Sequence, residues 1–231
     1  MAIFDYLLKI AGKDNLHIDK RISKKYIARL CIKYGFMMLR GLFFSLGYPC
    51  IQNTVFIGKN VKVFEKGSLK IGNKVKIHDN SFIDALSLEQ VVINNFVVLG
   101  RNTRIECTGS LSNLGKGLTI GERTTFGSDC FFGAAGGVKI GSDVIVGQFV
   151  RFHSQNHNFS DTNKLIREQG VSQLGIEIGD NCWIGAGAVF LDGAKLGNGC
   201  VVGANSVVTK CFPENSVIAG VPAKIIKFRG E

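Results

Sequence analysis

Residues 178–188 read IGDNCWIGAGA. In this stretch an isoleucine followed by a glycine occurs twice, six residues apart, at Ile178-Gly179 and at Ile184-Gly185. A small residue follows each isoleucine after four positions, first Cys182 and then Ala188. Self-similarity at a fixed short period indicates a repeat architecture, in which each unit stacks on its neighbours.

The same unit extends outward from this stretch, because an aliphatic residue or Phe recurs at steps of six from residue 51 onward. The units group in threes and predict seven coils, with inward-facing residues at 51/57/63, 71/77/83, 93/99/105, 120/126/132, 140/146/152, 178/184/190 and 196/202/208. Three short strands per coil form a triangular prism whose strands stack in parallel about 4.8 Å apart. A single coil cannot bury its apolar face, so the coils stabilise one another by stacking.

Two further features of the repeat concern the corners of the prism. We expect the glycine of each unit to relieve a tight turn. The small residue four positions after each inward one is expected to fit beneath a corner. Cys130, Cys182 and Cys200 occupy this position, and we therefore interpret them as core residues and not as nucleophiles.

The residues inserted between coils predict where chemistry takes place. They all follow the third unit of a coil, in the segments 64–70, 84–92, 106–119, 133–139 and 153–177. These excursions should therefore leave the prism from one edge, and loops on a rigid scaffold commonly carry function. The longest of them, 153–177, holds two of the four histidines.

Residues 1–50 do not follow the repeat and form a separate segment preceding the β-helix domain at 51–231. They carry nine Lys/Arg and three Asp, hence +6 of the chain's net charge of +10. Apolar residues recur at helical spacing, at positions 22, 26, 30, 34 and 38. This pattern predicts a basic amphipathic helix, which either caps the open end of the prism or lies on an anionic membrane surface. The two roles can coexist.

Composition excludes several classes of protein. The body lacks a zinc finger, an aromatic RNA-binding motif or a basic stripe, which argues against nucleic acid as a partner. The seven cysteines are odd in number and contain no CxxC, so a disulfide framework is not expected and a reducing cytoplasm fits better. Met1–Ile10 does not read as a signal peptide, and the most apolar run, 34–47, is too short to span a bilayer.

The repeat resembles that of the hexapeptide acyltransferases, and the likeness covers residues 51–227. It is most specific at 178–188, at 202–210 (VGANSVVTK) and at 218–224 (IAGVPAK), which look like the branch of maltose, galactoside and surface-polysaccharide O-acetyltransferases. The resemblance implies that the repeat forms a left-handed parallel β-helix. With the coils counted above and the helix expected from helical spacing, the predicted fold class is all-β, a left-handed parallel β-helix of about seven coils with an N-terminal α-helical segment. It also implies acetyl-CoA as acyl donor, no metal, and a homotrimer with its sites at subunit interfaces.

In that branch a loop histidine, roughly twenty residues before the Trp-Ile-Gly coil, acts as general base on a sugar hydroxyl. The matching residue here is His157, because an imidazole that titrates near neutrality can accept the hydroxyl proton. His153 is expected to orient His157, to bind the acceptor or to fill a corner. The family often supplies an acceptor for the base one coil earlier, where this chain has Gly127; Asp129 is a substitute for it near the substrate, and a backbone carbonyl is an equal alternative.

The resemblance also implies residues that bind acetyl-CoA. Trp183 points outward and would form a wall for pantetheine or a sugar face, or would pack against a neighbouring subunit. Ala186 and Ala204 match positions that line the pantetheine groove through backbone groups. The remaining matches, near the pantetheine, adenosine and phosphate ends, are Thr209, Lys210, Lys224 and Lys227; any one lysine taken alone reads equally well as a solvated side chain.

These features predict an O-acetyltransferase that acts on a sugar hydroxyl in surface polysaccharide (O-antigen or capsule) biosynthesis, in the cytoplasm or peripherally at the inner face of the membrane. One alternative is an N-acetyltransferase of an amino sugar or another small amine on the same scaffold. A second is a zinc hydratase, which would need His78, His153 and His157 around one ion, although His78 is expected four coils from His153 in the stack. A third is a non-catalytic scaffold.

Overall fold

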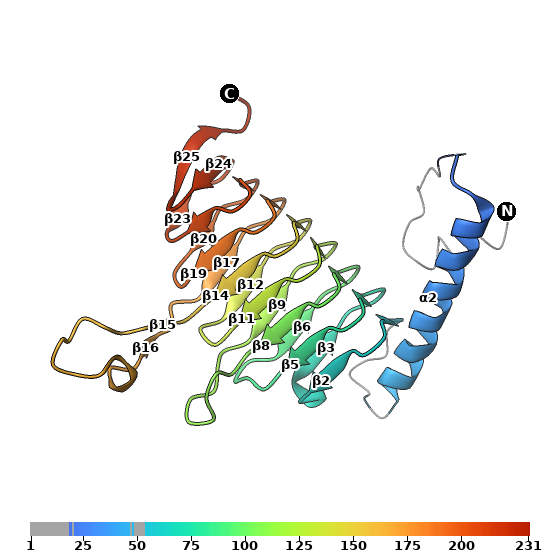
Figure 1. The fold of residues 1–231 in the computed structure, drawn as a ribbon, viewed down its shortest axis with the longest axis horizontal. Coiled ribbons are helices and arrows are strands. Elements are labelled where there is room, and N and C mark those ends of the chain that lie inside the picture. Colours follow the sequence, from blue (N-terminus) through green and yellow to red (C-terminus); the bar gives the residue numbers. More distant parts are fainter. Residues whose placement is uncertain (1–18, 20, 47, 49–53) are drawn as a thin grey trace.

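The body of the molecule is built from three sheets of short strands that stack coil upon coil (Figure 1). The computed structural model describes residues 19, 21–46, 48 and 54–231. Sheet A contains β1 (Phe56–Ile57), β4 (Lys76–Ile77), β7 (Val98–Leu99), β10 (Thr125–Phe126), β13 (Ile145–Val146), β18 (Trp183–Ile184), β21 (Val201–Val202) and β24 (Ser216–Gly220), and ends on the antiparallel β25 (Ala223–Phe228).

The other two sheets have the same parallel order. Sheet B contains β2 (Lys62–Phe64), β5 (Phe82–Asp84), β8 (Arg104–Glu106), β11 (Phe131–Gly133), β14 (Arg151–His153), β19 (Val189–Leu191) and β22 (Val207–Val208). Sheet C contains β3 (Leu69–Ile71), β6 (Val91–Ile93), β9 (Leu118–Ile120), β12 (Val138–Ile140), β17 (Ile176–Ile178), β20 (Lys195–Leu196) and β23 (Cys211–Phe212). Each coil gives one strand to each sheet, and the three strands run along the sides of a triangle.

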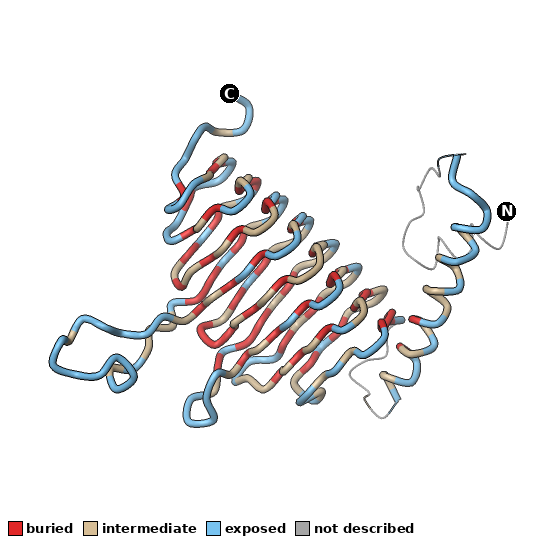
Figure 2. The backbone as a smooth tube through the Cα atoms, in the orientation of Figure 1, coloured by how far each residue is buried: buried red, intermediate tan, exposed pale blue. Residues whose placement is uncertain are grey.

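The predicted inward positions are confirmed from Ile57 to Val208. All of them are buried except Val63, which is partly buried, and Ile51 lies outside the described residues. Figure 2 shows buried segments recurring in every coil. Beyond Val208 the stack continues through β23 and β24, which bury Phe212 and Ile218. The chain therefore forms a left-handed parallel β-helix, with a partial eighth turn after the seven predicted coils.

The corners correct one expectation about glycine. The non-glycine residues with a left-handed backbone are mostly Asn and Asp, such as Asn102 (φ +56°) and Asp129 (φ +63°), whose short polar side chains tolerate this conformation. The repeat glycine, which follows most of the inward residues of sheets A and C, is needed for space instead. A Cβ at Gly100 would stand 2.2 Å from the carbonyl oxygen of Gly127, and one at Gly147 would stand 2.5 Å from the nitrogen of Ala186. Close stacking of the coils therefore selects glycine there.

The prediction of a single loop-bearing edge is confirmed. All five excursions run from a strand of sheet B to a strand of sheet C: β2 to β3, β5 to β6, β8 to β9, β11 to β12 and β14 to β17. The first includes the short 3₁₀ helix η1 (Lys66–Ser68). We call this edge the B–C corner, and the corner where sheet A passes into sheet B the A–B corner.

The N-terminal segment contains the helix α2 (Lys24–Ser45). Ser23 caps it, since its hydroxyl accepts a hydrogen bond from the Tyr26 backbone N–H. The helix packs on the first coil: Met37 is fully buried, and the Arg40 Nε donates to the carbonyl oxygen of Ile57 at 2.9 Å. The expected domain boundary at residue 50 lies outside the described residues. In the part of the chain that is described, no helix combines the length and apolarity needed to cross a bilayer.

Gly41 fixes how closely α2 approaches the β-helix. A Cβ at this position would stand 1.9 Å from the carbonyl oxygen of Val55, which belongs to the backbone and cannot turn aside. We expect Gly41→Ala to destabilise the docked helix by about 1–3 kcal/mol through overpacking. Gly35→Ala in the same helix is the control, since nothing lies within 4 Å of its Cβ. Amide hydrogen exchange of residues 24–45 measures the effect, and equal protection in the two variants would contradict it.

Candidate active site on the loop-bearing edge

The excursion 153–177 projects from the B–C corner as an arm (Figure 1). Its two sides pair as an antiparallel ribbon of β15 (Asn156–His157) and β16 (Val171–Ser172), in which His157 lies opposite Val171. The tip carries the 3₁₀ helix η2 (Ile166–Glu168). The pairing of β15 with β16 fixes the backbone of the arm at His157.

Polar side chains attach the arm to the prism. The fully buried Ser154 accepts a hydrogen bond from the Gly136 N–H and donates to the Gly133 carbonyl. Asp192, which follows β19 and is 7% exposed, accepts from the Ser172 hydroxyl and from the backbone N–H groups of Leu174 and Gly175 at 2.8–3.1 Å. Sequence reasoning missed both residues, although a carboxylate in a corner otherwise filled by small residues was a signal for Asp192.

We expect Asp192→Ala to reduce acetyl transfer about 10–100-fold, because a displaced arm misplaces His157 relative to its substrates. The substitution leaves three donors at the base of the arm without their acceptor. Glu168→Ala is the matched control, since Glu168 is an exposed carboxylate on the same arm. Activity is measured together with hydrogen exchange at 171–175. Full activity despite lost protection would refute a positioning role for Asp192.

The two arm histidines occupy different surroundings. His153 ends β14, is partly buried, and lies against the Phe131 ring with centroids 5.4 Å apart. Burial lowers the pKa of His153, and the nearby Arg151 cation lowers it further, so its imidazole is neutral at neutral pH. His157 is exposed, and its imidazole makes no hydrogen bond to any residue that the structure describes. The neutral His153 imidazole can accept a proton, and the His157 imidazole is open to solvent on the arm.

Asp129 lies elsewhere in the same chain. It occupies the A–B corner, where it accepts a hydrogen bond from the Asn102 amide at 2.8 Å and ends a ladder of corner amides that includes Asn60 and Asn80. The arm leaves from the B–C corner. One chain therefore does not bring Asp129 to His157, and the local structure assigns Asp129 a place in the corner ladder.

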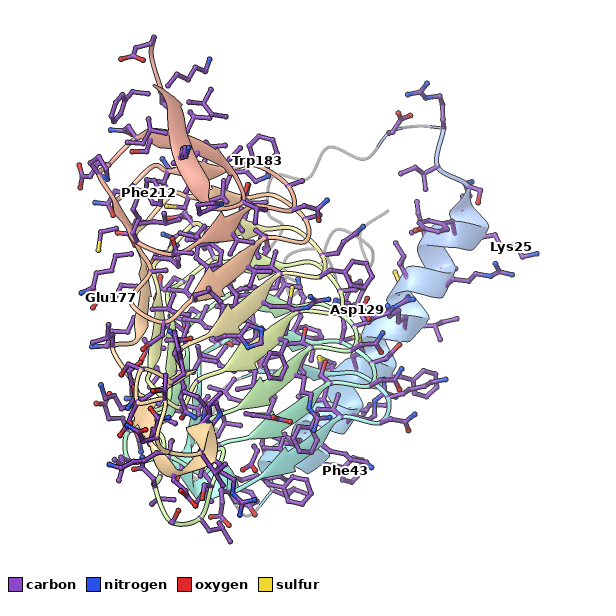
Figure 3. The ribbon with its side chains drawn as sticks, turned by 60° about the vertical axis from the view of Figure 1, so that its left-hand side comes forward. Lys25, Phe43, Asp129, Glu177, Trp183 and Phe212 are labelled. Atoms are coloured by element: carbon purple, nitrogen blue, oxygen red, sulfur yellow. The ribbon has the colours of Figure 1, made fainter. Side chains whose placement is uncertain are left out.

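Three of the residues matched to acetyl-CoA positions, Trp183, Lys224 and Lys227, lie on sheet A. Trp183 is 57% exposed on its outer face, as expected, and the strand register aligns it with Val201, Val217 and Lys227 on the next three strands. This column extends about 14 Å at the usual strand spacing. In Figure 3 Trp183 lies on the upper coils and Asp129 lower in the stack. Lys224 pairs with Ala219 on the same terminal hairpin.

The other matched residues lie around the corners. Ala186 and Ala204 are one above the other at the A–B corner, where a Cβ on Gly185 would stand 2.5 Å from the nitrogen of Ala204. The Ala186 amide donates to no described acceptor. Thr209 follows β22 at the end of sheet B, and Lys210 lies above the Phe212 ring.

One chain thus separates the two halves of the predicted site. In a triangular prism, the B–C corner that carries the arm is opposite the face formed by sheet A. His157 therefore projects away from the column that begins at Trp183. A complete site on this plan requires a second chain.

The arrangement of the histidines does not suit a metal. His78 follows β4 on sheet A, whereas His153 ends β14, three coils further along the stack and on another face. The expected separation of four coils is corrected to three coil steps, which still keeps His78 apart from the other two histidines. Among the residues described, no group of three or more His, Cys, Asp or Glu side chains is placed to hold a metal ion.

Comparison with known proteins adds the family to this geometry. The family model for the bacterial transferase hexapeptide (six repeats) matches residues 175–210, and that for the hexapeptide repeat of succinyl-transferase matches residues 117–147. Galactoside O-acetyltransferase of Escherichia coli K12 is 30% identical over 145 residues, which cover 60% of this chain and 67% of that protein. The chain belongs to the hexapeptide-repeat acetyltransferase family.

Two further similar proteins are named as an O-acetyl transferase and an N-acyltransferase. WbbJ of Escherichia coli K12, named for lipopolysaccharide biosynthesis O-acetyl transfer, is 41% identical over 97 residues, 39% of this chain and 50% of WbbJ. The crystal structure of a mutant of AntD, an N-acyltransferase from Bacillus cereus, superposes with a TM-score of 0.50 at 18% identity, covering 78% of this chain and 82% of AntD, and shows the shared fold. The chain spans about half of the length of the first curated relatives that it matches.

Proposed function

We propose that this chain is an acetyl-CoA-dependent O-acetyltransferase that acetylates a sugar hydroxyl in surface-polysaccharide biosynthesis, with His157 as general base. The observation that carries the proposal is the exposed imidazole of His157 on a paired arm that is anchored to the prism. Family membership supports transfer of an acetyl group, and the names of galactoside O-acetyltransferase and WbbJ support a hydroxyl acceptor on a sugar.

The outer face of sheet A fits acetyl-CoA in its chemistry. The column from Trp183 through Val201 and Val217 offers an apolar surface, and it ends at Lys227, with Lys224 on the same hairpin. An apolar track that ends in cations suits a ligand with a long chain and phosphate groups. When bound, the coenzyme supplies an activated acetyl thioester.

Residues of the chain take the other roles in the proposed acetyl transfer. The His157 imidazole accepts the hydroxyl proton of the acceptor, which makes the oxygen nucleophilic. In this proposal the Ala186 amide, which donates to no described acceptor, donates to the negative charge that develops on a carbonyl oxygen. His153, held on a strand end against Phe131, binds the acceptor near the base of the arm. Thr209 and Lys210 contribute contacts near the top of sheet B.

We propose a homotrimer in which the arm of one chain reaches the sheet A side of the next. The separation of His157 from Trp183 within one chain supports this assembly, and cyclic symmetry allows every chain to give one arm and receive one. Asp129 at the A–B corner would then lie on the receiving side.

The trimer predicts complementation between inactive chains. His157→Ala lacks the base, and Lys224→Glu/Lys227→Glu lacks cations at the far end of the column. In trimers co-assembled from equal amounts of the two, about a quarter of the sites combine an intact arm with an intact face, so about a quarter of wild-type activity should return. Activity no higher than the mean of the two parents would rule out a shared site.

A peripheral position at the inner face of the membrane accompanies this function. Helix α2 carries Lys24, Lys25, Arg29, Lys33 and Arg40 and no acidic residue. Cationic helices associate with anionic leaflets, which would bring the enzyme to a lipid-linked acceptor in the cytoplasm. If removal of residues 1–45 leaves vesicle co-sedimentation of the trimer unchanged, the membrane role is wrong.

The acceptor is tested with acetyl-CoA and a panel of free, nucleotide-linked and lipid-linked sugars, followed by mass spectrometry of the products. We expect an added acetyl group that alkaline treatment removes, as an ester requires. An alkali-stable acetamide would instead favour N-acetylation of an amino sugar. This alternative is supported by AntD, whose structure contains dTDP-4-amino-4,6-dideoxyglucose and coenzyme A.

A further inference from the structure

The cationic side of α2 faces a groove against the β-helix, at the end of the molecule far from the column of Trp183. The groove has a volume of about 670 Å³, within the range of small-molecule sites. It is lined by Arg29, Ile32, Lys33, Phe36 and Arg40 from the helix and by Lys59, Asp79 and Arg101 from the A–B corner. The helical residues fall on one stripe of α2.

The three corner residues come from consecutive coils. Lys59, Asp79 and Arg101 each occupy the second position after the inward residue of sheet A, so they follow one another along the A–B corner about 4.8 Å apart. The helix and the corner thus present two facing rows of side chains. Both rows belong to parts of the fold fixed by close packing, through Met37 and Gly41 of α2 and through the stacked coils.

The groove has a strong excess of positive charge. Five of its lining side chains are cations and one is a carboxylate. Asp79 is already engaged, since its Oδ1 accepts from the Lys59 backbone N–H at 2.7 Å. Arg29, Lys33, Lys59 and Arg101 form no ion pair with any described residue. Five facing cations beside a single carboxylate favour a further anion between them.

His78 precedes the groove residue Asp79 and is unusual for its position in the repeat. It takes the first corner position, which is glycine in the other six described coils of the A–B corner, namely Gly58, Gly100, Gly127, Gly147, Gly185 and Gly203. Its buried Nδ1 has no hydrogen-bond partner in the structure. Burial lowers the pKa of His78, and the cations of Lys33, Arg101 and Lys76 lower it further against the opposing effect of Asp79. A neutral imidazole therefore remains beside a cluster of positive charge.

The apolar residues of the groove indicate more closely which class of ligand fits it. Ile32 and Phe36 line it and are 60% and 57% exposed. The same face of α2 continues into Leu39, Phe43 and Leu46, which are also exposed; Figure 3 labels Lys25 and Phe43 near the two ends of the helix. Cations beside an apolar strip suit an anionic head that carries an apolar group.

We propose that the groove between α2 and the A–B corner binds the phosphate of a phosphate ester. Arg29, Lys33, Lys59 and Arg101 hold the phosphate oxygens, and Ile32 and Phe36 contact the apolar part of the ester. The phosphate comes either from a lipid headgroup in a bilayer or from a soluble ester. This site is distinct from the proposed acetyl-transfer site and does not depend on it.

The test uses the full chain without acetyl-CoA and two probes, inorganic pyrophosphate in solution and vesicles of phosphatidylcholine with or without phosphatidic acid. The groove variant is Lys59→Gln/Arg101→Gln. The matched control is Lys62→Gln/Lys70→Gln, which removes the same charge from exposed positions outside the groove. We expect pyrophosphate to bind the wild type and the control alike, and the groove variant about 10-fold more weakly or worse.

Proton NMR of His78 gives a second measurement. Bound anion offsets the cations of Lys33, Arg101 and Lys76 and should raise the pKa of His78 from its lowered value. If the groove variant also loses vesicle binding that requires phosphatidic acid, the phosphate is a lipid headgroup; if only pyrophosphate binding is lost, it is a soluble ester. Equal weakening of both probes by the control pair, or an unchanged His78 titration with pyrophosphate, would overturn the proposal.

Discussion

Replacing His157 with alanine should lower kcat for acetyl transfer by about 10²–10⁴-fold, because the acceptor hydroxyl then has no positioned base. The imidazole is exposed and makes no hydrogen bond to another described residue, so its removal should leave folding and thermal stability unchanged. Steady-state kinetics with acetyl-CoA and the acceptor found in the sugar panel measures the loss.

Two further variants test whether the loss of activity is specific to His157. Asn156→Ala alters the neighbouring exposed residue of β15, whose side chain points to the other face of the ribbon, and it should retain activity within a factor of a few. His153→Ala should raise KM more than it lowers kcat if His153 binds the acceptor. A full loss in His153→Ala with activity retained in His157→Ala would transfer the role of base to His153.

Phe152→Ala should destabilise the β-helix by about 3–5 kcal/mol. The Phe152 ring is fully buried between those of Phe132 and Phe190, with centroids 4.9 and 5.1 Å away and interplanar angles of 16°. Removing it opens a cavity between coils that cannot close without shifting the strands of all three sheets. Urea unfolding of the assembled protein measures the change.

Phe159→Ala is the control for this substitution, since Phe159 is 74% exposed on the arm. It should change the free energy of unfolding by less than about 0.5 kcal/mol. A loss below about 1 kcal/mol in Phe152→Ala would mean that the coils relax around the cavity and that the stacked rings do not hold the middle of the prism together.

These two predictions concern neighbouring residues, because Phe152 is followed by His153 and the arm begins there. The inward ring fixes the strand, and the strand fixes the origin of the arm through Ser154. Loss of activity in Phe152→Ala is therefore expected as a consequence of unfolding, and in His157→Ala without it. Comparing stability and activity in both variants separates packing from chemistry.

The sequence alone determined the architecture of this protein. The six-residue period located the buried side chains from Ile57 to Val208, and the places where the period was interrupted located the loop-bearing edge. Both followed because the repeat is local: a buried residue and a small residue four positions later recur on each side of the prism, and on sheets A and C a residue with no room for a Cβ usually follows the buried one. The same reasoning led to the histidines of the longest excursion.

Only the tertiary structure decided which of these residues can meet. It placed the arm at the corner opposite sheet A, so that His157 and Trp183 of one chain point apart, and it placed Asp129 in a ladder of corner amides. It also brought α2 against the first coils and formed the cationic groove there. The six-residue period predicts which residues are neighbours in adjacent coils. It does not predict contacts across the prism, between the helix and a corner, or between chains, because these depend on how distant segments pack.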